Sequence, residues 1–186
     1  NRKARKWHRD AHHTTLLFGA TACVLGLGTI GKRIARLLSA FDMNVIGLDA
    51  QITEKPDGVN DLRPPDRLHE SVVEADVVVV ALPLTNGTKG LIDASCFEQM
   101  KDTSILINIA RGPIVNETDL VEALRTGQIG AAGLDVFEEE PLSEDSPLWD
   151  MENVVITPHI SSRSDLGDQS IRAIFRENVR RYCEGE

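Results

Sequence analysis

The sequence predicts an α/β domain whose mostly parallel sheet is doubly wound and covered by helices on both faces. Three observations support this fold class. Apolar runs alternate with amphipathic segments along the chain, residues 77–80 are four consecutive valines, and a glycine-rich turn joins the first apolar run to the first helical segment. Unbroken apolar runs are typical of parallel strands buried on both faces. Such alternation gives right-handed crossovers and a ligand crevice beyond the carboxyl ends of the strands.

The expected elements follow one another from the glycine turn to the C-terminal region. The first expected strand ends at Leu25, and the others lie at 44–48, 76–81, 105–109, 131–134 and 154–156. The expected helices lie within 30–41, 68–73, 93–100, 116–126 and 165–183. Asp93 and either Asn116 or Thr118 are expected to begin helices, and Gly127 to end one. Proline and Asp-Gly punctuation predicts that no regular element crosses 51–66. We therefore expect a Rossmann-type domain over 1–186 with flanking helices.

Composition excludes several classes of partner. The chain has 186 residues, 41% of them hydrophobic, with a net charge of −9 and a pI near 5.0. An acidic chain is poorly suited to phosphate backbones, and no apolar stretch is long enough to cross a bilayer. The first residues also lack the apolar core of a signal peptide. We predict a cytoplasmic protein that binds neither nucleic acid nor membrane, and we interpret the basic run at 1–10 as an exposed helix face.

No metal site is expected from the sequence. Cys23, Cys96 and Cys183 lie far apart without metal-ligand spacing, and an odd number of cysteines is no disulfide framework. The histidines of the N-terminal region, at 8, 12 and 13, have no acidic or cysteine partner at ligand spacing. We interpret them as surface histidines.

The turn at 26–31 has the Gly-x-Gly-x-x-Gly spacing of a dinucleotide site between a strand and a helix. Gly26 permits the reversal, Gly28 lets the backbone approach a pyrophosphate, and Gly31 lets the helix pack close to the strand. Unpaired N–H groups at the helix N-terminus attract phosphates. Asp49 ends the second expected strand, where a carboxylate accepts from a ribose 2′-hydroxyl and repels a 2′-phosphate. The pattern favours NAD over NADP, with an ordinary turn and a solvated Asp49 as alternatives.

Three polar side chains follow expected strands at the same edge of the sheet. Arg111 can hold a carboxylate bidentately, and His159 can exchange a proton near neutral pH. Glu140 ends an acidic run, and a carboxylate beside an imidazole favours the protonated imidazole and fixes its orientation. Each also has a plainer interpretation. Arg111 could form a surface ion pair, His159 could be a structural histidine, and Glu140 could belong to a solvated acidic face. Spacing alone does not show that the three side chains meet.

Five segments together closely resemble the D-isomer-specific 2-hydroxyacid dehydrogenase family. They are the glycine turn and residues 81–85, 106–115, 132–142 and 156–160, in the family's order, and the resemblance extends from about Trp7 to Gly185. It implies NAD-dependent hydride transfer between nicotinamide and a D-2-hydroxy acid/2-oxo acid pair. It further implies that Arg111 binds substrate, that Glu140 supports the histidine, and that His159 is the acid/base.

The resemblance also implies cofactor contacts at the pyrophosphate, at the ribose, along the nucleotide and by the nicotinamide: Thr29, Ile30, Asp49, Pro83, Thr88, Ala110 and Asp135. One departure from the family is Ser161-Ser162, where small pairs containing glycine or alanine are more usual. This departure puts no catalytic role in doubt.

Family members have a second domain, built from segments before and after the cofactor-binding part, and this sequence contains almost none of it. That domain supplies donors for the substrate carboxylate and excludes water, so we expect the chain alone to bind NAD and turn over poorly. Relatives commonly dimerise through the cofactor domain, which makes a homodimer the expected assembly. Glyoxylate, hydroxypyruvate, lactate and phosphoglycerate all remain open as substrates.

Three other classes of protein could use parts of this sequence pattern. An NAD(H)-sensing or partner-binding module could use the same scaffold, although the Arg111, Glu140 and His159 set argues against it. A short-chain dehydrogenase needs a Tyr-x-x-x-Lys pair, which Tyr182, the sole tyrosine, cannot supply. A methyltransferase could use the glycine turn and the acidic second strand but has no evident use for the three polar side chains.

Overall fold

The computed structural model describes residues 14–164 and 167–186 and confirms the predicted fold class. Its sheet has seven parallel strands in the order β3-β2-β1-β4-β5-β6-β7. The strands are β1 (Thr21–Leu25), β2 (Asn44–Leu48), β3 (Asp61–Arg63), β4 (Val77–Val80), β5 (Ile105–Asn108), β6 (Ala131–Leu134) and β7 (Val154–Ile156). The basic N-terminal run, Trp7, the three histidines beside it and Leu166 lie outside the described residues.

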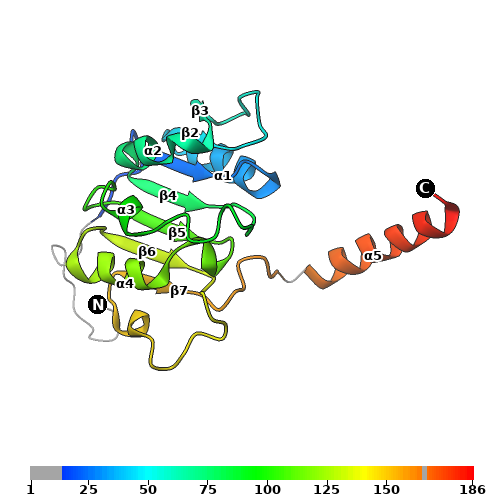
Figure 1. Ribbon diagram of the computed structural model, residues 1–186. Helices are drawn as coiled ribbons and strands as arrows, with labels where there is room; N and C mark the ends of the chain where they lie inside the picture. The colour runs from blue at the N-terminus through cyan, green and yellow to red at the C-terminus, as the bar shows by residue number, and fades with distance from the viewer. Residues whose placement is uncertain (1–13, 165–166) are drawn as a thin grey trace, which may run out of the picture.

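Helices lie on both faces of the sheet (Figure 1). They are α1 (Thr29–Ala40), α2 (Leu68–Glu74), α3 (Ala94–Phe97), α4 (Glu117–Thr126) and α5 (Gly167–Glu184). Helices α2, α3 and α4 pack on one face, where their apolar side chains form the main core with alternate residues of the strands. Helix α1 packs on the other face, over β1, β2 and β4. The crossover direction explains this split, because the chain first steps from β1 toward β3 and then returns through β4 to β7.

The central strands are buried because helices lie on both of their faces. All four valines of β4 and the last four residues of β1 are buried. Leu25 and Val80 point to the α2–α4 side, while Val24 and Val79 point to the α1 side. These strands therefore form a rigid platform from which the loops at their carboxyl ends project.

Helix α1 buries a narrower apolar stripe than its sequence predicts. Ile34 and Leu38 pack against the sheet, but Ile30, Leu37 and Phe41 are exposed. One face of a helix resting on a flat sheet touches it through about every third or fourth residue, so positions beside the stripe stay open. Ile30 lies in the first turn, beside the glycine loop.

The capping residues confirm three predicted helix ends, whereas α3 ends at Phe97 and not at Met100 as expected. Asp93 accepts a hydrogen bond from the Cys96 N–H at 3.1 Å, and Asn116 rather than Thr118 caps α4 by accepting from the Asp119 N–H at 3.1 Å. Gly127 ends α4 in the left-handed conformation, with φ at +72°.

The prediction that no regular element crosses 51–66 is wrong. Strand β3 pairs with β2 at the edge of the sheet, and a 3₁₀ turn follows at Pro65–Arg67. The side chain of Arg63 is buried and donates to Asp61, Ser71 and Glu74. A three-residue strand has no period to detect, so its existence depends on β2 and on this tertiary hydrogen-bond network.

In the β5–β7 half of the sheet, the described residues cover one face and leave the other face open. Val155 on β7 is exposed, and Ile105 and Ile107 on β5 are only partly buried. Helix α5 forms as predicted and extends away from the sheet in Figure 1, with Ile171, Phe175 and other apolar side chains exposed. No helix in the described part of the chain is long and apolar enough to cross a membrane.

Candidate functional site

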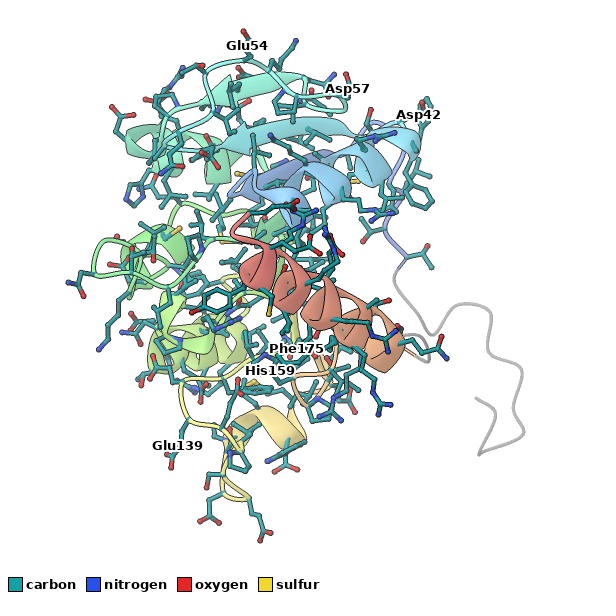
Figure 2. The ribbon with its side chains drawn as sticks, turned by 90° about the vertical axis from the view of Figure 1, so that its right-hand side faces the viewer. Asp42, Glu54, Asp57, Glu139, His159 and Phe175 are labelled. Atoms are coloured by element: carbon teal, nitrogen blue, oxygen red, sulfur yellow. The ribbon has the colours of Figure 1, made fainter. Side chains whose placement is uncertain are left out.

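The loops that follow the strands meet at one edge of the sheet. The carboxyl ends of the strands point to the right in Figure 1, and Figure 2 faces that edge. His159, which follows β7 in the chain, lies in the lower part of this view, while Glu54 marks the β2–β3 loop at the top. A parallel sheet brings all these loops to one edge, which explains how residues far apart in sequence come together.

Steric constraints determine two of the three turn glycines. Gly26 has φ at +92°, and a Cβ on it would lie 2.8 Å from the Ala81 carbonyl oxygen. A Cβ on Gly31 would lie 1.8 Å from the carbonyl oxygen of Gly26. Neither position accepts a side chain, because the first turn of α1 packs directly on the turn after β1.

Gly28 differs because a Cβ there would meet nothing within 4 Å. It is exposed at the N-cap of α1, and no described side chain caps this helix. The first N–H groups of α1 therefore face an open space, which is the arrangement that binds a phosphate. Gly28, Thr29 and Ile30 line a cavity of about 510 Å³ together with residues of the β4 and β5 loops.

Asp49 is tied to the glycine turn by its own hydrogen bonds. One carboxylate oxygen accepts from the Leu27 N–H at 2.8 Å, and the other accepts from Gln51 at 2.8 Å and Ile52 at 3.1 Å. Burial raises the pKa of Asp49, but these donors and the charge of Lys32 outweigh it and leave the pKa lowered. The carboxylate is therefore ionised and held at the end of β2.

The loop after β4 separates two hollows. The hydroxyl of Thr88 donates to the Pro83 carbonyl at 2.7 Å and accepts from the Thr85 N–H at 2.8 Å, which closes the loop on itself. Pro83 lines the larger cavity, and Thr88 lines a second one of about 130 Å³ beside Asp49. Leu25, Leu48, Pro65 and Leu68 are among the apolar walls of this smaller cavity.

The turn after β5 is held by a buried amide. Asn108 accepts from the Ala110 N–H at 3.1 Å and donates to the Arg111 carbonyl at 3.2 Å. Ala110 is buried, while Arg111 is exposed, and both line the larger cavity. The guanidinium of Arg111 donates to the Ala110 carbonyl at 2.6 Å. Among the described residues, the Arg111 guanidinium forms no ion pair.

Gly112 brings the Arg111 loop against the acidic loop after β6. A Cβ on Gly112 would lie 1.8 Å from the backbone C and O of Phe137 and 2.4 Å from the Glu138 nitrogen. Only glycine allows this approach, since backbone atoms on both sides leave no room to shift. The Arg111 and Glu140 loops are therefore in direct backbone contact.

Glu140 and His159 form a close pair. Nδ1 of His159 lies 2.7 Å from a carboxylate oxygen of Glu140, and because an ionised carboxylate only accepts, Nδ1 is the donor. The hydrogen bond from His159 lowers the pKa of Glu140, burial raises it in part, and the Phe137 N–H and the charge of Arg111 lower it further. The imidazole is thereby oriented with Nε2 left available for another partner.

His159 has an unusual backbone conformation, with φ at +51°. Non-glycine residues adopt this left-handed region infrequently, and they keep it where surrounding contacts hold it. The carboxylate of Asp135, 3% exposed, accepts hydrogen bonds from Thr157, Ile160 and Ser161 in the same loop. The oxygens of Asp135 are thus bonded to the loop that carries His159.

The structure brings the three predicted polar residues to one edge without joining all of them. Glu140 and His159 are in contact, whereas Arg111 makes no described contact with either. Its charge contributes to the lowered pKa of Glu140, after the His159 hydrogen bond and the Phe137 N–H. Of the predicted cofactor residues, five line the larger cavity and two line the smaller one, namely Gly28, Thr29, Ile30, Pro83 and Ala110, and Asp49 and Thr88. Gly26, Gly31 and Asp135 are buried.

Sequence reasoning missed three residues that build the site. Asn108 is a polar residue within an apolar strand, and such a residue usually has a specific partner. Gly112 directly follows Arg111 and had no recognised steric role. Thr157 carries no sequence signal for its bond to Asp135, because its partner is 22 residues away.

The arrangement fits a dinucleotide. Gly28 leaves room for a pyrophosphate, the uncapped N–H groups of α1 supply donors, and Asp49 places a carboxylate at the end of β2 that could accept from a ribose hydroxyl. The small cavity has the apolar walls that an adenine ring needs. Among residues 14–164 and 167–186, no three His, Cys, Asp or Glu side chains group as metal ligands.

Comparisons with known proteins agree with this geometry. Residues 1–161 match the family described as D-isomer specific 2-hydroxyacid dehydrogenase, NAD binding domain. The chain is similar to a D-3-phosphoglycerate dehydrogenase of Archaeoglobus fulgidus, with 37% identity over 98% of this chain and 34% of the relative.

Two solved structures are also similar. One is a D-isomer specific 2-hydroxyacid dehydrogenase family protein of Aeromonas salmonicida subsp. salmonicida A449, with TM-score 0.89 and 41% identity over 100% of this chain and 58% of that one. The other is an NADPH-dependent glyoxylate/hydroxypyruvate reductase of Sinorhizobium meliloti in complex with NADP and sulfate, with TM-score 0.84 and 32% identity over 99% and 58%.

The chain spans only part of these relatives, from 34% of the archaeal protein to 58% of the two structures. The family match over residues 1–161 includes the glycine turn, all seven strands and the Glu140–His159 pair. The chain therefore belongs to the D-isomer specific 2-hydroxyacid dehydrogenase family, as its NAD binding domain.

Proposed function

We propose that this chain is the cofactor-binding and acid/base part of an NAD-dependent oxidoreductase that interconverts a D-2-hydroxy acid and a 2-oxo acid. The observation that carries the proposal is the 2.7 Å contact between His159 Nδ1 and Glu140, at the same sheet edge as the open N-terminus of α1. A dinucleotide site alone fits many functions. An oriented imidazole beside it is what a hydride-transfer enzyme needs for its proton.

The residues expected to hold the cofactor follow its length. Thr29, Ile30 and the N–H groups of α1 take the pyrophosphate, Asp49 the ribose, and Pro83 and Thr88 the nucleotide along the β4 loop. Ala110 and Asp135 are the expected neighbours of the nicotinamide. When bound, the nicotinamide supplies the group that exchanges a hydride with the substrate carbon.

NAD is the proposed cofactor rather than NADP because of Asp49. Its carboxylate is ionised and fixed by three N–H groups at the end of β2, where a 2′-phosphate would be repelled. The Sinorhizobium meliloti relative is NADPH-dependent, so this preference is a property to measure in this protein. We expect NADH to bind at least about tenfold more tightly than NADPH in a fluorescence titration, and the Asp49→Ser variant to narrow this ratio.

The proposed chemistry assigns one role to each polar residue. Arg111 holds the substrate carboxylate and polarises the carbonyl oxygen where negative charge develops. In the direction of reduction, protonated His159 donates a proton from Nε2 to that oxygen, while Glu140 stabilises and orients the imidazolium through Nδ1. In the direction of oxidation, neutral His159 accepts the hydroxyl proton.

The rest of the active site is expected from outside this chain. The side chains of His159 and Glu140 are 45% and 36% exposed, and hydride transfer needs water to be excluded from around them. A second domain of the full-length protein would close over this edge, and two copies would associate as a homodimer. Phosphoglycerate, glyoxylate and hydroxypyruvate are the candidate acids that relatives' names suggest.

The test is steady-state NADH oxidation by the full-length protein that contains this chain, with a panel of 2-oxo acids. His159→Gln should lower kcat at least about 100-fold, because general acid–base catalysis contributes about 10²–10⁴. His69→Gln, at an exposed histidine of α2, is the matched control and should leave kcat unchanged. Wild-type turnover by the His159 variant would refute the assignment. Tight NADH binding by the wild-type protein with no turnover on any acid would favour an NAD(H)-sensing module instead.

A further inference from the structure

The loop after β7 is folded around one buried carboxylate, that of Asp135 at the end of β6. The Thr157 hydroxyl and the Ile160 N–H donate to one of its oxygens, at 2.6 and 2.9 Å, and the Ser161 N–H donates to the other at 3.0 Å. Hydrogen bonds to an ionised acceptor are stronger than neutral ones. The donors lie on both sides of His159 in the sequence, so the carboxylate holds the loop at two ends.

His159 itself is held by backbone bonds within this loop. Its N–H donates to the Asp135 carbonyl at 2.8 Å and to the Thr157 carbonyl at 3.0 Å. Its φ of +51° is a conformation that an ordinary residue leaves when the contacts around it are weakened. The same conformation brings Nδ1 to Glu140, which belongs to a different loop.

We propose that Thr157 and Asp135 are positioning residues for His159, whose left-handed backbone depends on the hydrogen bond between the Thr157 hydroxyl and the Asp135 carboxylate. The inference rests on the proposed function, in which His159 exchanges the proton, and goes beyond it by assigning what holds that histidine in place. In this role neither residue touches the substrate. Thr157 acts only through the loop, whereas Asp135 acts through the loop in addition to its expected place beside the nicotinamide. The expected consequence of losing their bond is an imidazole that no longer meets Glu140.

Thr157 offers the sharper test of the two. It is exposed, so replacing it does not open the core, and Thr157→Val removes one hydroxyl while keeping the shape. The three N–H donors of the loop remain in this variant. In the full-length protein we expect Thr157→Val to lower kcat about tenfold, the effect of losing one charge-assisted hydrogen bond. The Kd for NADH, measured by fluorescence titration, should stay within about twofold.

Two further variants separate the hydroxyl from a general effect of mutation. Thr157→Ser restores the donor and should restore kcat to within about twofold of the wild type. Thr103→Val makes the same change at an exposed threonine just before β5, at the opposite edge of the sheet, and should leave kcat unchanged. Asp135→Asn should lower kcat further than Thr157→Val, because an amide group places a donor against the Ser161 N–H.

A spectroscopic measurement tests the proposal without a turnover assay. We call the hydrogen bond between Thr157 and Asp135, which is proposed to hold the His159 backbone, the clamp. The ³J coupling between the amide and α protons of His159, and its ¹³Cα shift, report its φ in histidine-labelled protein. We expect Thr157→Val to move both signals away from the left-handed values, and Thr157→Ser to keep them. A purely structural role for Thr157 would lower the melting temperature and leave these signals in place.

The outcomes distinguish this inference from the proposed function. If His159→Gln abolishes turnover while Thr157→Val keeps both wild-type kcat and the left-handed signals, the clamp is wrong and the proposed function stands. If His159→Gln keeps wild-type turnover, the proposed function fails, and the inferred catalytic role of the clamp fails with it. Loss of kcat in Thr157→Val with unchanged His159 signals would also overturn the clamp.

Discussion

The two ends of the functional edge are built in different ways. The glycine-turn end is continuous in sequence from β1 to Asp49, and backbone atoms make most of its contacts. The acid/base end assembles Arg111, Glu140 and His159 from three separate loops, and side chains make its decisive contacts. Backbone contacts tolerate almost no change in shape, whereas a side-chain contact can be removed without unfolding the chain. We therefore expect most substitutions at the glycine-turn end to lower the stability of the fold. Most substitutions at the acid/base end should lower enzyme activity instead.

Gly112 is the exception that connects the two behaviours. It belongs to the acid/base end, yet its contact with Phe137 is a backbone approach as tight as that of Gly31 with Gly26. The loop carrying Arg111 is thus fixed like the glycine turn. The His159 loop, by contrast, is held by hydrogen bonds to one carboxylate.

The largest expected effect is the loss of folding in Gly31→Ala and Gly112→Ala. Each added Cβ would lie 1.8 Å from backbone atoms, which neither a rotamer change nor a small shift can relieve. We expect each variant to lose at least about 3 kcal/mol in denaturant unfolding or to be recovered unfolded. Gly133→Ala is the control, because its Cβ would meet only a side chain at 3.9 Å. Near-wild-type stability of Gly112→Ala would remove the exception described above.

Next in size is the effect of Glu140→Gln on turnover. The neutral amide keeps the shape but loses the charge that stabilises the imidazolium, so kcat in the full-length protein should fall by roughly 10- to 100-fold. The Kd for NADH should stay unchanged because Glu140 is not an expected cofactor contact. Glu139→Gln, the exposed neighbour in the same acidic run, should behave as wild type. Equal losses in the two variants would show that the acidic run acts through net charge rather than through the His159 contact.

The third effect is an acid-dependent loss of stability that depends on Asp135. Burial raises the pKa of Asp135, but hydrogen bonds from the Ser161 and Thr157 side chains and from the Ser161 and Ile160 N–H groups lower it overall from 3.8 to about 2. A carboxylate with a depressed pKa stabilises the folded state above its ordinary pKa, and this contribution disappears as pH falls toward the folded value.

Between pH 5 and pH 2 the wild type should therefore lose about 2 kcal/mol more unfolding free energy than Asp135→Asn, measured by urea denaturation. Parallel curves for the two proteins across this range would contradict the assignment. The measurement sharpens the comparison because it isolates the carboxylate that holds the His159 loop.

The smallest expected effect is on cofactor affinity in Gly28→Ala. A Cβ there meets nothing within 4 Å, so the free energy of unfolding should change by less than about 1 kcal/mol. The same Cβ would fill the space proposed for the pyrophosphate, and NADH binding should weaken at least about tenfold. Gly133→Ala, which lies within β6, should leave NADH affinity unchanged. Wild-type affinity in Gly28→Ala would move the proposed pyrophosphate site elsewhere.

Most of the fold and half of the site could be predicted because their causes are local. Six of the seven strands, the caps at Asp93 and Asn116, and the glycine turn follow from apolar runs, helix capping and backbone conformations that short sequences encode. β3 could not be predicted, since its three residues depend on pairing with β2 and on the buried Arg63. The exposure of Ile30, Leu37 and Phe41 on α1 could not be predicted for a similar reason. The width of the buried face of α1 depends on the sheet beneath it.

The sequence by itself determined the order of strands and helices, the spacing of the three glycines and the presence of an arginine, a glutamate and a histidine after buried strands. Only the tertiary structure decided that Glu140 meets His159, that Gly112 carries the Arg111 loop onto Phe137, and that Thr157 meets Asp135. The physical reason is range. Backbone propensity and apolar periodicity act over a few residues, whereas these contacts join residues 19 to 25 positions apart through a sheet that must first be assembled.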